Sequence, residues 1–138
     1  MVATRLADNP MGEGLARTPV LVVEDDPDDV RVIFRALRAG GRFDPVHART
    51  GSDGLQAAAA GSFGLCLVDY RLPDMSGIEM CRRLRALGIP APVILLSSVQ
   101  SDAVVARALA AGASEFLVKH LSFGERLEAE VERVLRAA

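Results

Sequence analysis

The sequence has no tryptophan, and aromatic residues make up only 4% of it. A core of large aromatic side chains is therefore excluded, and the interior has to consist of Val, Leu, Ile and Ala. The net charge of −2 gives no general attraction to nucleic acid. Apolar runs long enough to span a membrane are absent, as is the apolar centre of a signal peptide. We expect a cytoplasmic protein that binds neither nucleic acid nor a membrane.

Cysteine is also scarce, with Cys66 and Cys81 the only two. Neither lies at metal-ligand spacing from another Cys or a His. Cys66 falls in an apolar run and Cys81 in a helical pattern. We interpret both as small packing residues in a reducing compartment.

What is present fits one globular domain, since the chain has 138 residues, of which 50% are hydrophobic and 25% charged. Residues 1–18 are mostly small or polar and include Pro10 and Gly12, which predicts a flexible leader. A regular pattern begins at Pro19, so we place a single domain over residues 19–138.

Short apolar runs alternate with segments of helical periodicity along this domain. The strongest runs are continuously apolar, which indicates strands covered on both faces and a parallel sheet between two helical layers. The pattern predicts an α/β fold of five strand–helix units, (βα)5. The expected strands are residues 19–23, 44–48, 63–69, 92–97 and 115–118. The expected helix caps are Asp26, Ser52, Ser76, Ser101 and Ser122.

Polar residues stand at the ends of four of these strands. Glu24 and Asp25 follow the first strand, and Asp69 ends the third. Ser97 ends the fourth strand, and Lys119 follows the fifth. In an open parallel sheet these ends meet at one edge, where ligands bind. Each residue alone has a structural explanation as a cap, a turn or a solvated group, but their combination outweighs it.

Clustered carboxylates repel one another, and a hard cation such as Mg²⁺ relieves that conflict. Because Mg²⁺ uses only one or two carboxylates together with phosphate oxygens, Asp69 could attack phosphorus and form an aspartyl phosphate. Lys119 is the only lysine among the 16 basic residues, and it could place a compact positive charge beside the transferred group. The Ser97 hydroxyl could add a hydrogen bond.

Four segments resemble the receiver domains of bacterial two-component response regulators. They are VLVVEDDPDD, LVDYRLPDMSGIE, PVILLSS and GASEFLVKH, in this order along the chain. The resemblance covers nearly all of residues 19–138. It implies a doubly wound, flavodoxin-like sheet with strand order 2-1-3-4-5. It also implies a phosphorelay signalling domain rather than an enzyme.

The resemblance further implies that Asp69 is the phosphoacceptor and that Mg²⁺ is the cofactor. The implied metal ligands are Asp25 directly, Glu24 through a water molecule, Asp69, and the backbone carbonyl of Arg71. The other implied site residues are Ser97 as the switch hydroxyl, Lys119 as the phosphate-contacting cation and Phe116 as the aromatic that changes rotamer on activation. Simple core packing is the other interpretation of Phe116.

One position departs from the family pattern, because His120 stands where a proline, often with a cis bond, usually follows the lysine. A non-proline cis bond costs about 2.5–4 kcal/mol, so we expect a trans bond and a loop that could place Lys119 differently. We interpret His120 as a loop residue and His47 as structural.

The resemblance implies a histidine kinase or a histidine phosphotransfer protein as phosphodonor. A downstream protein or an output domain would contact the helices expected at 101–111 and 122–137, and a homodimer stays open. The His120 departure favours one alternative, a receiver-like interaction module that is not phosphorylated. A phosphohydrolase would need a second carboxylate where Arg71 stands, and a flavodoxin-type phosphate site is disfavoured by the acidic first loop.

Overall fold

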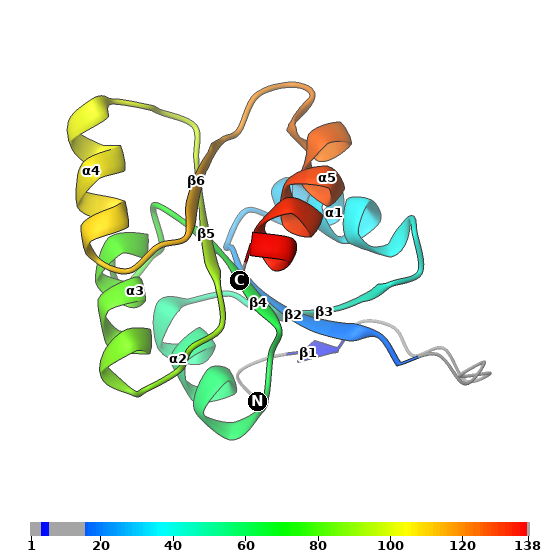
Figure 1. Cartoon of the computed structure of the whole chain (residues 1–138), viewed down its shortest axis with the longest axis horizontal. Helices are drawn as coiled ribbons and strands as arrows, with labels where there is room; N and C mark the ends of the chain where they lie inside the picture. Colours follow the sequence, from blue (N-terminus) through cyan, green and yellow to red (C-terminus); the bar gives the residue numbers. More distant parts are fainter. Residues whose placement is uncertain (1–3, 6–15, 138) are drawn as a thin grey trace.

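The computed structural model describes residues 4–5 and 16–137, which form one sheet flanked by helices (Figure 1). The strands in this part of the chain are β1 Thr4–Arg5, β2 Thr18–Val23, β3 Phe43–Ala48, β4 Leu65–Asp69, β5 Val93–Ser97 and β6 Glu115–Val118. The helices are α1 Pro27–Arg38, α2 Gly51–Ala60, α3 Gly77–Ala86, α4 Asp102–Ala110 and α5 Phe123–Ala137. Strands and helices alternate from β2 onward, as the sequence pattern predicts.

The sheet has the strand order β1-β3-β2-β4-β5-β6. The strands from β2 to β6 are parallel, and their order is 2-1-3-4-5 when they are counted from β2, which confirms the predicted fold. β1 pairs antiparallel with β3, with Thr4 opposite His47. This short strand lies within the segment expected to be a flexible leader, of which residues 1–3 and 6–15 lie outside the described residues.

Two helical layers cover the sheet because alternate residues of each strand face opposite sides. Val20 and Val22 belong to a core formed with residues of α1 and α5. Leu21 and Val23 belong to a second core formed with residues of α2, α3 and α4. Figure 1 shows these two groups of helices on either side of the sheet. Continuous apolar runs therefore did indicate strands covered on both faces.

Both cysteines lie in the second core as free thiols. Burial raises the pKa of the Cys66 thiol to about 12, so the thiol is neutral at physiological pH. A buried, neutral thiol is a poor nucleophile and metal ligand. The interpretation of Cys66 and Cys81 as packing residues agrees with this environment.

Side-chain caps fix the starts of most helices. Asp26 caps α1, Ser76 caps α3 and Ser101 caps α4, each by accepting a backbone N–H two or three residues on, as predicted. The prediction of Ser52 as the cap of α2 is wrong, because the hydroxyl of Thr50 accepts from the N–H of Asp53.

Ser122 also departs from the predicted capping role. Its hydroxyl oxygen lies 3.1 Å from Nδ1 of His120, and the N–H of Glu125 donates to the backbone carbonyl of Ser122. The first turn of α5 is therefore fixed by the backbone and by the preceding loop. All peptide bonds of the described residues are trans, including the one between Lys119 and His120.

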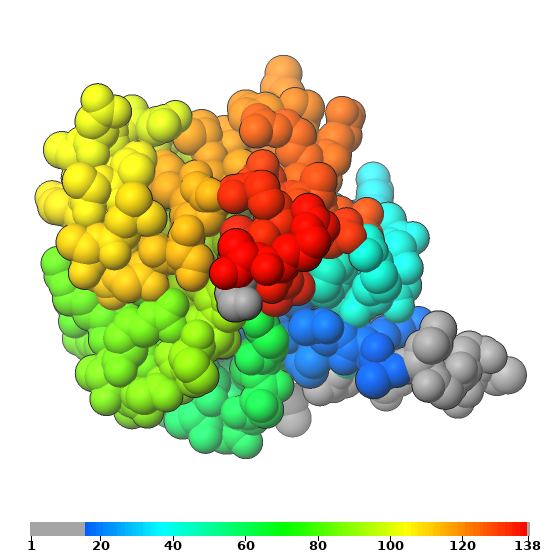
Figure 2. All heavy atoms as spheres, in the orientation of Figure 1, coloured from blue at the N-terminus to red at the C-terminus, as the bar shows by residue number. Residues whose placement is uncertain are grey.

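Helices α4 and α5 occupy one face of the molecule, α4 in yellow and α5 in red in the space-filling view (Figure 2). Ala108 is the only fully buried residue of α4, and the Leu109 side chain is exposed. A helix with so little burial is easily displaced relative to the sheet. None of the described helices is long and apolar enough to cross a membrane.

Candidate functional site

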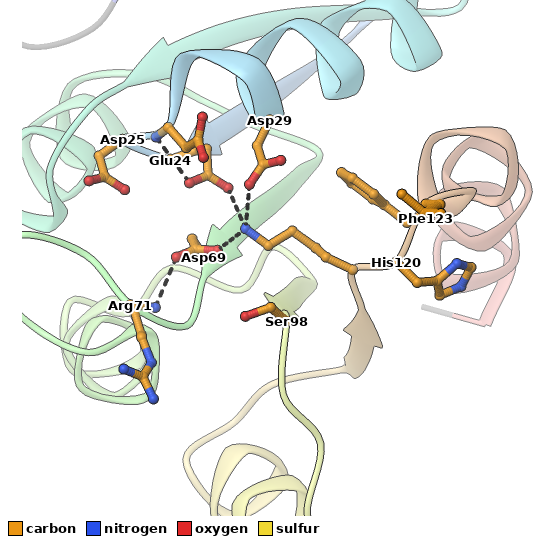
Figure 3. A pocket seen from close by; sticks show the side chains of 11 residues that line it. Glu24, Asp25, Asp29, Asp69, Arg71, Ser98, His120 and Phe123 are labelled. Carbon is orange, nitrogen blue, oxygen red and sulfur yellow. Dashed lines mark hydrogen bonds and ion pairs between the residues drawn. The ribbon is translucent and has the colours of Figure 1, made fainter.

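The carboxyl ends of four parallel strands bring polar side chains to one edge of the sheet. Glu24 follows β2, Asp69 is the last residue of β4, and Lys119 follows β6. Asp69 lies opposite Leu96 of β5 in the sheet, and Leu96 is followed by Ser97, the last residue of β5. The convergence expected from the strand ends is present for Glu24, Asp69 and Lys119, which line the pocket shown in Figure 3.

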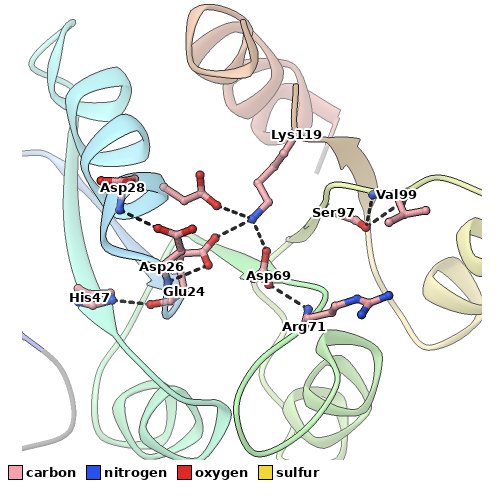
Figure 4. Close-up of polar contacts among 10 residues, drawn as sticks. Glu24, Asp26, Asp28, His47, Asp69, Arg71, Ser97, Val99 and Lys119 are labelled. Atoms are coloured by element: carbon pink, nitrogen blue, oxygen red, sulfur yellow. Dashed lines mark hydrogen bonds and ion pairs between the residues drawn. The ribbon is translucent and has the colours of Figure 1, made fainter. Parts of the chain in front are cut away.

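Lys119 is the centre of the polar contacts (Figure 4). Its Nζ lies 2.6 Å from Oδ1 of Asp69, 2.7 Å from Oδ2 of Asp29 and 3.1 Å from Oε1 of Glu24. Only 13% of the Lys119 side chain is exposed. Its backbone N–H donates to the carbonyl of Ser97 at 2.6 Å. The ammonium group thus contacts side chains from α1, from the end of β4 and from the residue after β2. These contacts form although His120, and not the usual proline, follows the lysine.

Burial and neighbouring charges shift the pKa values of Glu24 and Lys119. Glu24 is 1% exposed, and burial together with the charge of Asp69 raises its pKa to about 7, although Lys119 acts to lower it. Burial lowers the pKa of Lys119, but the hydrogen bonds that its ammonium donates to Asp29 and Asp69, together with the charge of Glu24, outweigh this effect and raise the pKa above its ordinary value. The lysine therefore stays charged while the buried glutamate sits near its titration point at neutral pH.

Three carboxylates form a group able to hold a cation. One oxygen each from Glu24, Asp25 and Asp69 lies within 4.8 Å of the others, with Asp25 exposed and the other two buried. Oxygen-only donors with an open side suit Mg²⁺, which keeps several waters. The residues present therefore fit the implied metal.

Asp69 has both carboxylate oxygens engaged, because its Oδ2 accepts the N–H of Arg71 at 2.9 Å while Oδ1 contacts Lys119. This bond places the Arg71 backbone beside the acidic group. The Arg71 guanidinium lies away from the carboxylates in Figure 3. A phosphohydrolase would need an acid at this position, so its absence disfavours that alternative.

Ser97 is buried at the end of β5, but its hydroxyl is turned to its own loop. It donates to the carbonyl of Val99 at 2.7 Å and accepts the N–H of Val99 at 3.1 Å. The structure thus brings Ser97 to the correct strand end without directing its hydroxyl to Asp69. The neighbouring Ser98 lines the pocket instead. Phe116 is half-buried and packs against the core under α3 and α4.

His120 lines the rim of the pocket, and its ring is held by the start of α5. Its Nε2 lies 3.0 Å from Nη1 of Arg126, and its Nδ1 lies 3.1 Å from the Ser122 hydroxyl oxygen. His47 places its Nε2 2.7 Å from the backbone carbonyl of Glu24. His120 therefore contacts side chains at the start of α5, and His47 contacts the backbone beside the site.

Sequence reasoning missed Asp29. It lies in the first turn of α1, where an acidic residue is ordinarily explained by the positive end of the helix dipole. No local sequence signal points to Lys119 as its partner, because the two residues are 90 positions apart. Its contact with Lys119 makes it part of the site.

A parallel sheet in the order 2-1-3-4-5 with an acidic group and a paired lysine at its carboxyl edge defines a receiver-type domain. The chain belongs to the response regulator receiver domain family, because that family's model matches residues 20–132. Domains of this family act in two-component phosphorelay signalling.

Individual proteins agree with this assignment. The chain is 37% identical over 124 residues to the transcriptional regulatory protein KdpE of Mycobacterium tuberculosis (strain CDC 1551 / Oshkosh), which covers 88% of this chain and 54% of KdpE. A BeF3-activated DrrB receiver domain is 30% identical with a TM-score of 0.75, covering 88% of this chain and 99% of that domain. The receiver domain of the Francisella response regulator 1452 is 26% identical with a TM-score of 0.80, covering 88% of this chain and 98% of that one. The chain spans about half the length of the curated relatives it matches first.

Proposed function

We propose that Asp69 accepts a phosphoryl group from a phosphohistidine of a histidine kinase or a histidine phosphotransfer protein. The observation that carries this proposal is the Nζ of Lys119 at 2.6 Å from Oδ1 of Asp69, beside a group of carboxylates that fits a divalent cation. A nucleophilic carboxylate, a fixed positive charge and a metal-binding group are the parts that phosphoryl transfer to an aspartate requires.

Glu24, Asp25, Asp69 and the Arg71 carbonyl would hold Mg²⁺, which neutralises charge on the phosphoryl oxygens when bound. In the transfer, an Asp69 oxygen forms the new bond to phosphorus while the bond from phosphorus to the donor nitrogen breaks. The donor imidazole leaves with the electron pair of that bond and is neutral once its nitrogen is protonated. Lys119 stabilises the charge that develops on the phosphoryl group.

Activation then depends on two side chains near the site. The Ser97 hydroxyl has to leave Val99 and rotate toward the phosphoryl group, which pulls the loop after β5 with it. Phe116 lies on β6, next to β5 in the sheet, and would change rotamer in the space that this movement opens. The weakly buried helix α4 is the element that can shift in response.

The output surface would be the face formed by α4 and α5. Leu109 on α4 is 50% exposed, and Leu121 before α5 is fully exposed. Exposed leucines on α4 and in the loop before α5 suit contact with a downstream protein, an output domain or a second copy of the chain. A location in the cytoplasm, a signalling rather than an enzymatic role and the absence of direct nucleic-acid binding complete the proposal, with residues 19–138 as the receiver domain and 1–18 as its leader.

The test is a mass measurement after incubation with acetyl phosphate and Mg²⁺. We expect the wild-type protein to gain the mass of one phosphoryl group and Asp69→Asn to gain none. Asp26→Asn is a matched control, because Asp26 caps α1 and lies outside the group of three carboxylates. Equal labelling of wild-type protein and Asp69→Asn would contradict the assignment of the acceptor.

The competing interpretation is an unphosphorylated interaction module, which the His120 departure favours. Its distinguishing test is Mg²⁺-dependent binding of beryllofluoride, a mimic of the phosphoryl group. Binding with wild-type protein and none with Asp69→Asn supports phosphorylation. A wild-type protein that binds no beryllofluoride and gains no phosphate would favour the interaction module.

A further inference from the structure

Asp29 differs from the neighbouring acids of α1 in what it contacts. Its Oδ2 lies 2.7 Å from Nζ of Lys119, and its side chain is 26% exposed. Asp28, one residue earlier, has a 79% exposed side chain that pairs with Arg31 on the same helix. Two adjacent aspartates therefore have the same chemistry, but only one of them is directed to the lysine of the site.

The partners of Lys119 fall into two kinds. Glu24 and Asp69 belong to the group of carboxylates that can hold a cation, and Asp29 does not. A cation shared by Glu24 and Asp69 weakens their hold on the ammonium, because both carboxylates then have a second positive neighbour. With a cation bound, Asp29 would be the one carboxylate among these three partners that lies outside the cation-binding group and keeps Lys119 as its cationic contact.

The backbone of Lys119 is already held by its N–H bond to the Ser97 carbonyl at 2.6 Å. The position of the ammonium therefore depends on the long side chain and on what that side chain contacts. Asp29 lies in the first turn of α1 and Asp69 at the end of β4, so two different elements contact the ammonium (Figure 3). A phosphoryl group on Asp69 has to compete with Asp29 for the same N–H donors.

We propose that Asp29 is a positioning residue that restrains Lys119 in the unphosphorylated state and competes with the phosphoryl group for its ammonium. This inference rests on the proposed function. Its consequence is that Asp29 weakens the binding of a phosphoryl group at Asp69 and so keeps the resting state populated. The carboxylate acts through Lys119 and does not take part in the transfer itself.

The experiment measures beryllofluoride affinity at saturating Mg²⁺ for wild-type protein, Asp29→Asn and the matched control Asp28→Asn. Removing one partly exposed ion pair changes an affinity by about fivefold, so we expect Asp29→Asn to bind beryllofluoride about fivefold more tightly than wild type. Asp28→Asn should stay within about 1.5-fold, because Asp28 is solvated and contacts Arg31.

The Mg²⁺ affinity without beryllofluoride separates competition from damage to the site. Loss of a negative charge leaves Mg²⁺ binding equal or weaker, whereas a distorted site would weaken both ligands. Asp29→Ser provides a second variant with a smaller side chain and should tighten beryllofluoride in the same way. Affinities equal to or weaker than that of Asp28→Asn in both Asp29 variants would overturn the inference. A wild-type protein that binds no beryllofluoride would instead overturn the proposed function.

Discussion

Replacing Glu24 by Gln should stabilise the metal-free protein at alkaline pH. The pKa of Glu24 rises from its ordinary 4.5 to about 7, chiefly because of burial and then because of the charge of Asp69. One pKa unit corresponds to about 1.36 kcal/mol, so ionising this side chain in the folded protein costs about 3 kcal/mol more than in the unfolded chain. Gln has the same size and no charge to desolvate.

The sign of the pH dependence follows from proton binding. Between pH 4.5 and about 7 the folded state binds more protons at Glu24 than the unfolded state does, so stability falls as the pH rises through this range. At pH 4.5 the favourable contribution is nearly complete, and above pH 7 it is lost. The free energy of unfolding of Glu24→Gln should therefore exceed that of wild type by less than about 1 kcal/mol near pH 5 and by about 3 kcal/mol at pH 8.

Urea denaturation with a chelator present, from pH 5 to pH 8, measures this difference. The wild-type minus variant comparison cancels the other titrating groups, because they are shared. A difference that stays constant with pH, or a variant less stable than wild type at pH 8, would refute the reasoning. Added Mg²⁺ should stabilise wild type more than the variant at pH 8, since ligand binding to the folded state adds stability and Gln lacks the anionic oxygen.

Three other changes test side-chain contacts, one remote from the site and two at it or in its loops. In urea denaturation, Arg85→Ala should lower the free energy of unfolding by about 2 kcal/mol, because the Arg85 guanidinium donates to three backbone carbonyls. The control Arg83→Ala loses only an exposed ion pair and should lower it by less than about 1 kcal/mol. Asp74→Ala should lower the free energy of unfolding by about 1 kcal/mol in the same assay, because the Asp74 carboxylate accepts two N–H groups at the start of α2. It should also weaken Mg²⁺ binding in a titration, because these bonds anchor the loop that carries Arg71. Lys119→Met should destabilise the metal-free protein by about 3 kcal/mol, and thermal melts should show Mg²⁺ recovering part of that loss. Three results would contradict these predictions. They are an Arg85→Ala protein as stable as Arg83→Ala, an Asp74→Ala protein with unchanged Mg²⁺ affinity, and a Lys119→Met protein as stable as wild type.

The strands could be predicted from the sequence because their signal is local. Val20 to Val23 and Leu65 to Val68 are continuously apolar, and such runs have few other interpretations when Gly, Pro or Asp residues bound them. The acidic edge followed from this, since knowing where a parallel strand ends is enough to place Asp69 and Lys119 at one rim. Long-range convergence was thus inferred from purely local patterns.

What could not be predicted depends on distant partners or on rotamers. The start of α2 was placed at Ser52 because a serine hydroxyl is a good cap, but the carboxylate of Asp74 satisfies the N–H groups of Gly51 and Ser52 from another loop. The helix therefore begins earlier and takes Thr50 as its cap. Asp29 was missed for the same reason, because its partner lies 90 residues away in the sequence.

The acidic edge combines residues that disfavour one another in the resting protein. Glu24 and Asp69 are both buried, and the charge of Asp69 makes Glu24 harder to ionise. Lys119 relieves this repulsion only in part, because its ammonium also forms an ion pair with Asp29. A cation and a phosphoryl group would replace that partial compensation, because the first neutralises the acids and the second gives the lysine a stronger partner. The energy that drives the switch would therefore come from repulsion already present in the unphosphorylated fold, and a site with fewer buried acids would respond less to phosphorylation.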